Sequence, residues 1–250
     1  MNSQGAKPLA GRVCVVTGAT RGIGWSAAVE LARRGAHVVA VGRTIGALEE
    51  LDDAIKTHGD SATLVQFDLK DVAAIDRLGA AIYERWGRLD GLVANAGLLG
   101  AITPLGHLDP KVWDDVMAVN VTANWRLIRS LDPLLRQSDA GRAVFLSSGA
   151  AHACKPFWGV YSVSKAALDA LVRTYSGELI STKVKANLFS PGPVRTAMRA
   201  KAMPGEDPLT LPHPDELAPA IVDLVSPDCI ESGRIYDFRQ KRFLDFNQPD

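Results

Sequence analysis

A tyrosine and a lysine stand four residues apart in the stretch YSVSK, at positions 161 and 165. If this stretch is helical, both side chains lie on one face with Cβ atoms about 6 Å apart. A phenol in water loses its proton only near pH ~10, so it is a poor acid–base catalyst at neutral pH. A neighbouring ammonium favours the phenolate and lowers the pKa of the phenol. The pair is therefore either a reaction centre, in which Lys165 brings Tyr161 into a range that is useful for proton transfer, or an ordinary helix turn, because an isolated Y-x-x-x-K motif is common by chance.

A glycine cluster follows the first apolar run, in VTGATRGIGW, where a strand would turn into a helix. Gly18, Gly22 and Gly24 permit positive φ there and let a phosphate approach the N–H groups of a helix N-terminus. The spacing is T-G-x-x-x-G-x-G, which differs from the common G-x-G-x-x-G fingerprint. A plain tight turn is the alternative interpretation of the glycines alone.

The end of the second apolar run indicates which dinucleotide would bind. An NAD site usually has a carboxylate at this point for the ribose 2′-hydroxyl. Here the run ends in Val41, Gly42, Arg43 and Thr44, without a carboxylate. The planar, permanently charged Arg43 suits a 2′-phosphate, and Arg21 in the glycine turn could reach the same phosphate. The sequence therefore favours NADP(H) over NAD(H), although both arginines could instead be solvated surface charges.

The predicted elements explain how these residues could meet. Val- and Leu-rich runs without strict polar alternation are typical of parallel strands buried on both faces. We expect strands at 12–18, 37–42, 63–68, 92–97, 143–148, 184–192 and 234–238, of which the last closes the sheet. Helical spacing predicts helices at 24–35, 45–59, 72–87, 111–135, 160–180 and 214–225. This alternation predicts an α/β fold, a doubly wound parallel sheet with helices on both faces, which binds ligands beyond the carboxyl ends of its strands.

Composition narrows the class of protein. The 250 residues are 47% hydrophobic and 22% charged, which fits a single domain over residues 1–250. Lys plus Arg and Asp plus Glu number 28 each, so we expect neither a nucleic-acid nor an anionic-membrane partner. Cys14, Cys154 and Cys229 suggest neither a disulfide framework nor a metal site. The sequence shows no signal peptide and no apolar run of the ~20 residues that a membrane helix needs, so we expect a cytoplasmic protein.

The motifs TGATRGIG, NAG at 95–97 and YSVSK, in this order and spacing, resemble those of the short-chain dehydrogenase/reductase family. The resemblance covers the chain from about residue 10 to about residue 200, and it is to the compact oxidoreductase branch. The stretch after the sixth strand resembles a little-characterised bacterial subgroup. The resemblance implies a Rossmann fold and an NAD(P)-dependent enzyme that interconverts a carbonyl and an alcohol by hydride transfer.

The resemblance also implies a role for each matching residue. Ser148, thirteen positions before Tyr161, would hold the carbonyl oxygen of the substrate, with Ser147 as the competing choice. Tyr161 would be the acid–base, Lys165 would tune it and bind the nicotinamide ribose, and the backbone of Asn120 would bind a water in the proton relay. The residues expected at the cofactor are Gly18, Thr20, Arg21, Gly22, Ile23, Gly24, Arg43, Thr44, Asp68, Leu69, Asn95, Ala96, Gly97, Tyr161, Lys165, Pro191, Gly192, Val194 and Thr196.

These cofactor residues fall into groups by the part of the cofactor that they would meet. Asp68 and Leu69 match the positions at the adenine, although a lone aspartate at a strand end is also typical of a helix cap. Residues 95–97 match the segment beside the adenine ribose. Residues 191–196 match the turn that positions the nicotinamide carboxamide.

Apolar residues beside the motifs indicate the substrate. Leu98, Leu99, Ile102, Phe157 and Trp158 would form an apolar wall, which favours a small or medium apolar ketone, aldehyde or secondary alcohol over a free sugar. The alternative is that Phe157 and Trp158 pack the loop into the core. Residues 197–212 would form a mobile lid that orders when a ligand binds.

The resemblance further implies a homodimer, or a homotetramer built from dimers, through the helices at 111–135 and 160–180. Val121, Trp125, Leu168, Leu171 and Val172 cover more than one face of these helices, which supports this assembly. The C-terminal stretch GRIYDFRQKRFLDFNQPD lacks the Asp-Gly-Gly ending that many tetrameric relatives carry.

Two other functions fit parts of the pattern. A catalytically silent NADP-binding regulator would keep the fold and the cofactor site, but the four catalytic positions are intact. A serine hydrolase would use Ser148 and His152, but Ser148 lacks a G-x-S-x-G elbow and His152 has no evident carboxylate partner.

Overall fold

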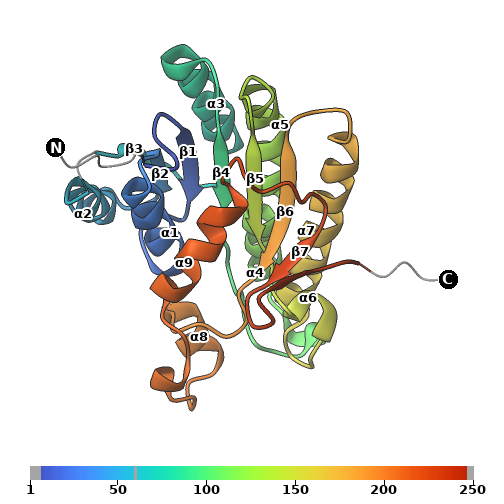
Figure 1. The fold of residues 1–250 in the computed structure, drawn as a ribbon. Helices are drawn as coiled ribbons and strands as arrows, with labels where there is room; N and C mark the ends of the chain where they lie inside the picture. Colours follow the sequence, from blue (N-terminus) through green and yellow to red (C-terminus); the bar gives the residue numbers. More distant parts are fainter. Residues whose placement is uncertain (1–6, 59–60, 247–250) are drawn as a thin grey trace.

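The computed structural model describes residues 7–58 and 61–246, and it contains an eight-stranded sheet between two layers of helices (Figure 1). The strands are β1 Val13–Thr17, β2 His37–Gly42, β3 Thr63–Gln66, β4 Gly91–Ala94, β5 Arg142–Leu146, β6 Lys185–Ser190, β7 Ile235–Asp237 and β8 Arg242–Leu244. Their order is β3-β2-β1-β4-β5-β6-β7-β8, and every neighbouring pair is parallel except β7 and β8. The predicted doubly wound parallel sheet is therefore confirmed.

The strands are apolar on both faces because successive side chains point to opposite sides of a sheet and both sides are covered. Val13 and Val15 of β1 belong to one buried cluster, whereas Cys14 and Val16 belong to the other. Helices α1 Gly22–Arg33, α2 Ile45–Lys56 and α9 Pro214–Leu224 supply the second cluster. Helices α3 Val72–Trp86, α5 Ala123–Leu135 and α7 Gly159–Glu178 supply the first, from the opposite face of the sheet (Figure 1).

Local signals in the sequence set several helix ends. Asp71 begins α3, where its side chain accepts a hydrogen bond from Ala74 N at 3.0 Å, and Gly87 ends it with a φ of 69°. His213 begins α9 in a capping box with Glu216, whose carboxylate accepts from His213 N at 2.6 Å.

The structure corrects three of the predicted elements. The predicted helix 111–135 consists of α4 Pro110–Met117, a π-helical turn at Ala118–Thr122, and α5. The predicted last strand does not close the sheet, because β8 pairs antiparallel with β7 and forms the edge. The predicted helix 45–59 ends at Lys56, and residue 59 lies outside the described residues.

The remaining short elements were not predicted, and they lie in the connections after β4, β5 and β6. They are η1 Leu105–His107, α6 Ala150–Ala153, α8 Ala197–Ala202 and η3 Pro208–Thr210. Across the described part of the chain, no helix is long and apolar enough to cross a membrane. The same residues contain no group of three or more His, Cys, Asp or Glu that could hold a metal ion.

Candidate active site

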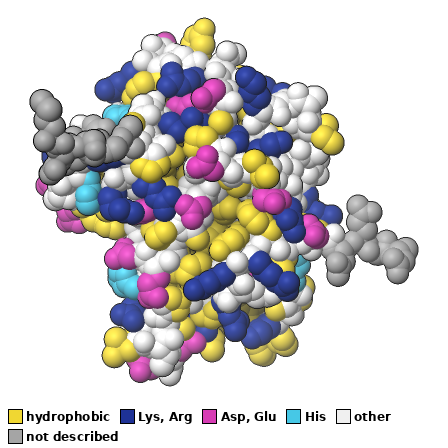
Figure 2. All heavy atoms as spheres, viewed as in Figure 1, with side chains coloured by type: hydrophobic (Ala, Val, Ile, Leu, Met, Phe, Trp, Pro, Cys, Tyr) yellow, Lys and Arg dark blue, Asp and Glu magenta, His cyan; other side chains and the backbone are white. Residues whose placement is uncertain are grey.

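A cleft of about 1750 Å³ lies at the carboxyl ends of β1, β2, β4, β5 and β6. Figure 2 shows hydrophobic side chains gathered in a hollow in the lower half of the molecule, with Lys and Arg side chains around it. Pockets for drug-sized ligands have volumes of roughly 300–1,000 Å³, so the cleft has room for a dinucleotide and a small second molecule. All the predicted site residues line it except Gly24 and Asn120. The structure thus brings together residues that the sequence separates by more than a hundred positions.

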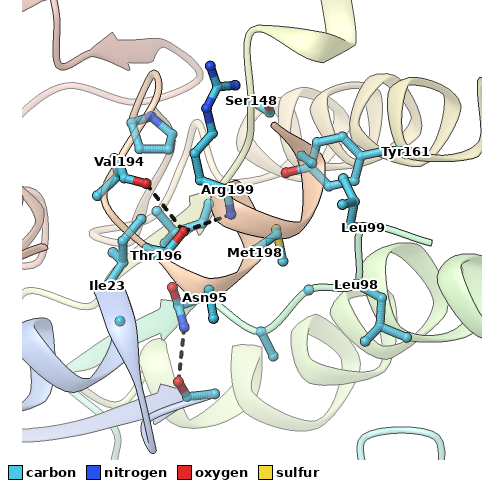
Figure 3. Close-up of a pocket in the computed structure, with 18 of the residues that line it drawn as sticks. Ile23, Asn95, Leu98, Leu99, Ser148, Tyr161, Val194, Thr196, Met198 and Arg199 are labelled. Atoms are coloured by element: carbon cyan, nitrogen blue, oxygen red, sulfur yellow. Dashed lines mark hydrogen bonds between the residues drawn. The ribbon is translucent and has the colours of Figure 1, made fainter. Parts of the chain in front are cut away.

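The glycine turn between β1 and α1 needs its glycines. Gly18 and Gly22 have φ of 63° and 55°, in the left-handed region that favours glycine. Gly24 is packed so closely that a Cβ there would clash with Gly18 O and Asn95 Nδ2. The same Asn95 Nδ2 donates to Thr17 O at 3.0 Å and to Gly18 O at 3.2 Å, which ties the turn to the end of β4 (Figure 3). The first turn of α1 then offers backbone N–H groups that have no partner within the helix.

Cationic and hydroxyl groups line the cleft beside β2. Arg43 has a 61% exposed side chain, and its closest carboxylate is Asp68 Oδ2 at 4.0 Å. Thr44 stands at the N-cap of α2 without a side-chain capping hydrogen bond, and Arg21 stands likewise at the N-cap of α1. The helix-cap interpretation of Asp68 is wrong, because Asp71 caps α3. The side chains of Arg21, Arg43 and Thr44 are therefore available to an anionic ligand.

Tyr161 and Lys165 lie one turn apart on α7, and both are buried. Tyr161 lies close to Ser148, which follows β5, and Figure 3 shows both residues on the same side of the cleft. The Lys165 Nζ donates to Leu146 O at 2.6 Å and lies 5.8 Å from the centre of the Tyr161 ring. The structure thus brings together Ser148, Tyr161 and Lys165, as predicted.

Burial dominates the pKa of both side chains. Burial raises the pKa of the Tyr161 phenol, and the nearby Ser148 side chain opposes this. Burial lowers the pKa of Lys165 to about 8, and the charge of Asp169 opposes this. The predicted net lowering of the Tyr161 pKa is wrong for this arrangement, because burial is the largest cause of the shift and raises the pKa.

Asn120 lies in the π-helical turn and ties together three segments. Its Oδ1 accepts from Leu98 N at 2.7 Å, and its Nδ2 donates to Leu98 O and to Ser164 Oγ, each at 2.9 Å. Its backbone oxygen accepts from Asn124 Nδ2 at 2.8 Å. Asn124 was not among the predicted site residues, although it lies one helical turn after Asn120, where its side chain can reach the Asn120 carbonyl oxygen.

The turn after β6 forms another wall of the cleft. Gly192 has a φ of 69°, and a Cβ there would lie 2.8 Å from Arg239 Cδ. Thr196 caps α8, since its Oγ1 accepts from Arg199 N at 3.2 Å and donates to Val194 O at 3.3 Å (Figure 3). Arg239, from the turn between β7 and β8, was missed because no motif marks that turn.

The predicted apolar wall is only partly present. Leu98, Leu99, Ile102 and Trp158 line the cleft, whereas Phe157 does not. Phe157 is 55% exposed with a φ of 73°, so it neither lines the cleft nor packs into the core.

Within the predicted lid, the Arg199 guanidinium pairs with both oxygens of the Glu206 carboxylate, at 2.6 Å for the Nη2–Oε1 contact.

The structure also bears on the hydrolase alternative. His152 does have a carboxylate partner, because its Nε2 lies 3.2 Å from Asp169 Oδ2. The other oxygen of Asp169 accepts a hydrogen bond from Ser147 Oγ. A serine hydrolase needs its histidine between the serine and the acid, whereas here the acid lies between the two. This cluster is therefore not a hydrolytic triad.

The sheet order and the serine, tyrosine and lysine at its cleft define a class, that of Rossmann-fold oxidoreductases. The profile of the short chain dehydrogenase family matches residues 12–207. The oxidoreductase YciK of Escherichia coli K12 is 37% identical over 237 residues, which cover 92% of this chain and 93% of YciK. The chain belongs to the short-chain dehydrogenase/reductase family, as its motifs predicted, and it is an oxidoreductase of that family.

Two further relatives differ in the cofactor that their names give. A short chain dehydrogenase of Escherichia coli CFT073, solved in complex with NADPH, has a TM-score of 0.89 and 37% identity, with 93% of this chain and 98% of that chain covered. An NAD-dependent oxidoreductase of Mycobacterium tuberculosis H37Rv is 37% identical over 212 residues, which cover 79% of this chain and 76% of the relative.

Proposed function

We propose that this protein is an NADP(H)-dependent oxidoreductase that interconverts a carbonyl and an alcohol. The observation that carries the proposal is the meeting of Ser148, Tyr161 and Lys165 in the same cleft as the glycine turn. The Ser148 and Tyr161 side chains lie close together in this cleft, so one oxygen atom of a ligand could reach both hydroxyl groups.

The cleft fits a phosphorylated dinucleotide. The N–H groups at the start of α1 suit the pyrophosphate. Arg43 and Arg21 suit a 2′-phosphate, because the end of β2 holds no carboxylate that would repel it. The NADPH complex of the Escherichia coli CFT073 relative supports this choice, whereas the name of the Mycobacterium tuberculosis relative leaves NAD(H) as the alternative. The turn after β6, with Gly192 and Thr196, and the Lys165 ammonium would hold the nicotinamide riboside.

The chain's own residues would handle the proton. The bound nicotinamide supplies or accepts the hydride. Ser148 would hold the carbonyl oxygen while Tyr161 donates its proton to that oxygen during reduction or removes the alcohol proton during oxidation. A raised pKa keeps the Tyr161 phenol protonated at neutral pH, which is the state that reduction requires. Lys165 would stabilise the phenolate that forms, and Asn120 would hold the relay water.

The walls of the cleft favour an apolar substrate. Leu98, Leu99 and Met198 of α8 line it with apolar side chains (Figure 3). Trp158 also lines it, with its ring 6.1 Å from the Tyr161 ring. We therefore assign a small or medium ketone, aldehyde or secondary alcohol as the substrate class. Comparing kcat/KM for an aryl ketone with that for an open-chain sugar checks this, and a clear preference for the sugar would contradict it.

Incubation of the protein with NADPH and a panel of carbonyl compounds tests the proposal against the silent regulator. An enzyme consumes NADPH with at least one aryl ketone or aldehyde in the panel. Tight binding of NADPH, with no consumption by any member of the panel, would favour the regulator.

A further inference from the structure

One face of α7 meets the end of β5 over three successive turns. Tyr161, Lys165 and Asp169 are spaced four residues apart and therefore share this face. Tyr161 lies close to Ser148, and Lys165 donates to Leu146 O. Between these two residues, Ser147 Oγ donates to Asp169 Oδ1. The segment that holds the substrate-binding serine and the acceptor of Lys165 is thus attached to α7 through Asp169.

Asp169 is a buried carboxylate, and burial raises its pKa although the charges of Lys165 and Arg173 oppose this. Its side chain is 5% exposed, and the groups that face it are Ser147 after β5, His152 of α6, and Lys165 and Arg173 of its own helix. The His152 side chain is 56% exposed, so it connects the buried carboxylate with the solvent. Phe246 lies against this cluster, with its ring 5.9 Å from the His152 ring and 4.4 Å from the Arg173 guanidinium.

Lys165 needs a counter-charge because a buried ammonium is costly. Its Nζ is bonded to a neutral carbonyl oxygen, that of Leu146. Within residues 7–58 and 61–246, Lys165 forms no ion pair shorter than 4.0 Å. Asp169, one helical turn away, is the anion whose charge opposes the effect of burial on the pKa of the lysine.

We propose that Asp169 is a positioning residue of the catalytic centre: its carboxylate balances the charge of Lys165 and anchors Ser147, and His152 favours the ionised form of that carboxylate against the effect of burial. The role of this pair in turnover rests on the proposed function, whereas its effect on Lys165 does not. If Asp169 loses its charge, the ammonium loses a favourable interaction, so the lysine gives up its proton at a lower pH. Any activity that needs protonated Lys165 would then be lost at a lower pH.

Two substitutions separate charge from structure. Asp169→Asn removes the charge but keeps an oxygen that can accept from Ser147. His152→Gln removes only the exposed partner of the carboxylate. The matched control is His58→Gln, because His58 follows α2 and does not line the cleft.

The readout is the pKa of Lys165 in the cofactor-free protein, measured by NMR of lysines labelled with ¹³C at Cε and assigned by comparison with Lys165→Arg. Relative to the unmodified protein, we expect Asp169→Asn to lower this pKa by roughly one pH unit. His152→Gln is expected to lower it by less, because it acts on Lys165 only through Asp169, and His58→Gln is expected to leave it unchanged.

A Lys165 pKa that stays at its native value in both Asp169→Asn and His152→Gln would overturn the proposal. Should Asp169→Asn fail to fold, the exposed His152→Gln decides alone, and an unchanged Lys165 pKa in it overturns the proposal. With a substrate in hand, the alkaline limb of the pH profile of kcat/KM should move to lower pH with the pKa. A protein without any turnover would contradict the proposed function and would leave the NMR result to stand by itself.

Discussion

At the scale of the residue, the Tyr161 hydroxyl is the group that the mechanism uses most directly. Tyr161→Phe removes this hydroxyl and keeps the ring, which packs edge-on against Trp158. We expect kcat to fall by at least about 10²-fold, the typical contribution of a positioned acid–base group. The Kd for NADPH should change little, whereas Lys165→Ala should weaken both turnover and binding. Tyr83→Phe, at a 64% exposed site on α3, is the control, and a Tyr161→Phe enzyme that kept most of its activity would refute the mechanism.

In the proposed function, the Arg43 guanidinium carries the preference for NADP(H). Arg43→Asp would place a carboxylate where a 2′-phosphate is expected and remove a charged hydrogen-bond donor. A hydrogen bond to a charged group contributes about 1.5–3 kcal/mol, so the Kd for NADPH should rise roughly 10- to 100-fold. NADH should then bind better than NADPH. Titration of nicotinamide fluorescence measures the Kd for NADPH and the Kd for NADH. The control is Arg77→Asp, at an exposed site on α3. Equal affinity of the unmodified protein for the two cofactors would contradict the assignment.

The sequence indicates some site residues better than others. Ser148, Tyr161 and Lys165 were predictable because they lie in a recognisable motif with fixed spacing. The pairing of Asp169 with His152 was not, because the two residues come from different helices and meet only once α6 folds back over α7. The upward shift of the Tyr161 pKa was also not predicted, because it results from burial, which depends on tertiary packing that residue spacing does not reveal.

At the scale of the element, the turn between β1 and α1 depends on the absence of a side chain at position 24. In Gly24→Ala the new methyl would clash with Gly18 O and Asn95 Nδ2, and overpacking of this kind costs about 1–3 kcal/mol. We expect a lower Tm and weaker NADPH binding. The control is Gly46→Ala in α2, where a Cβ meets no atom within 4 Å and alanine should raise stability by about 0.5–1 kcal/mol. An equal Tm for the two variants would show that the turn tolerates a side chain.

The long strands and helices of the sheet were predictable, whereas the short elements were not. Apolar runs identify β1, β2, β4, β5 and β6 because both layers of helices bury these strands. The π-helical turn at Ala118–Thr122 leaves the apolar spacing of the predicted helix nearly intact, so it gives no signal. Strand β8 has three residues, too few for a periodic pattern, and its Phe243 packs edge-on against Tyr236 of β7.

At the scale of the whole molecule, the helices α4, α5 and α7 remain the predicted surface for assembly. Leu168 and Val172 are buried in the subunit's own core, so they do not belong to that surface. Trp125 and Val163 do remain available, at 44% and 42% exposed. If these residues form the interface of a dimer, Trp125→Glu should shift the protein to a monomer in light scattering at micromolar concentration. Tyr83→Glu on α3 is the control, and a native protein that is monomeric would contradict the prediction.

Transfer of a labelled hydride from NADPH to a ketone tests the proposed reaction most directly. The protein is given NADPH that carries deuterium at the transferable position of the nicotinamide, together with an aryl ketone that supports NADPH consumption. We expect mass spectrometry to find one deuterium at the carbinol carbon of the alcohol product, and we expect Tyr161→Phe to form almost none of this product. Consumption of NADPH without deuterium in the alcohol, or undiminished transfer by Tyr161→Phe, would contradict the proposed reaction.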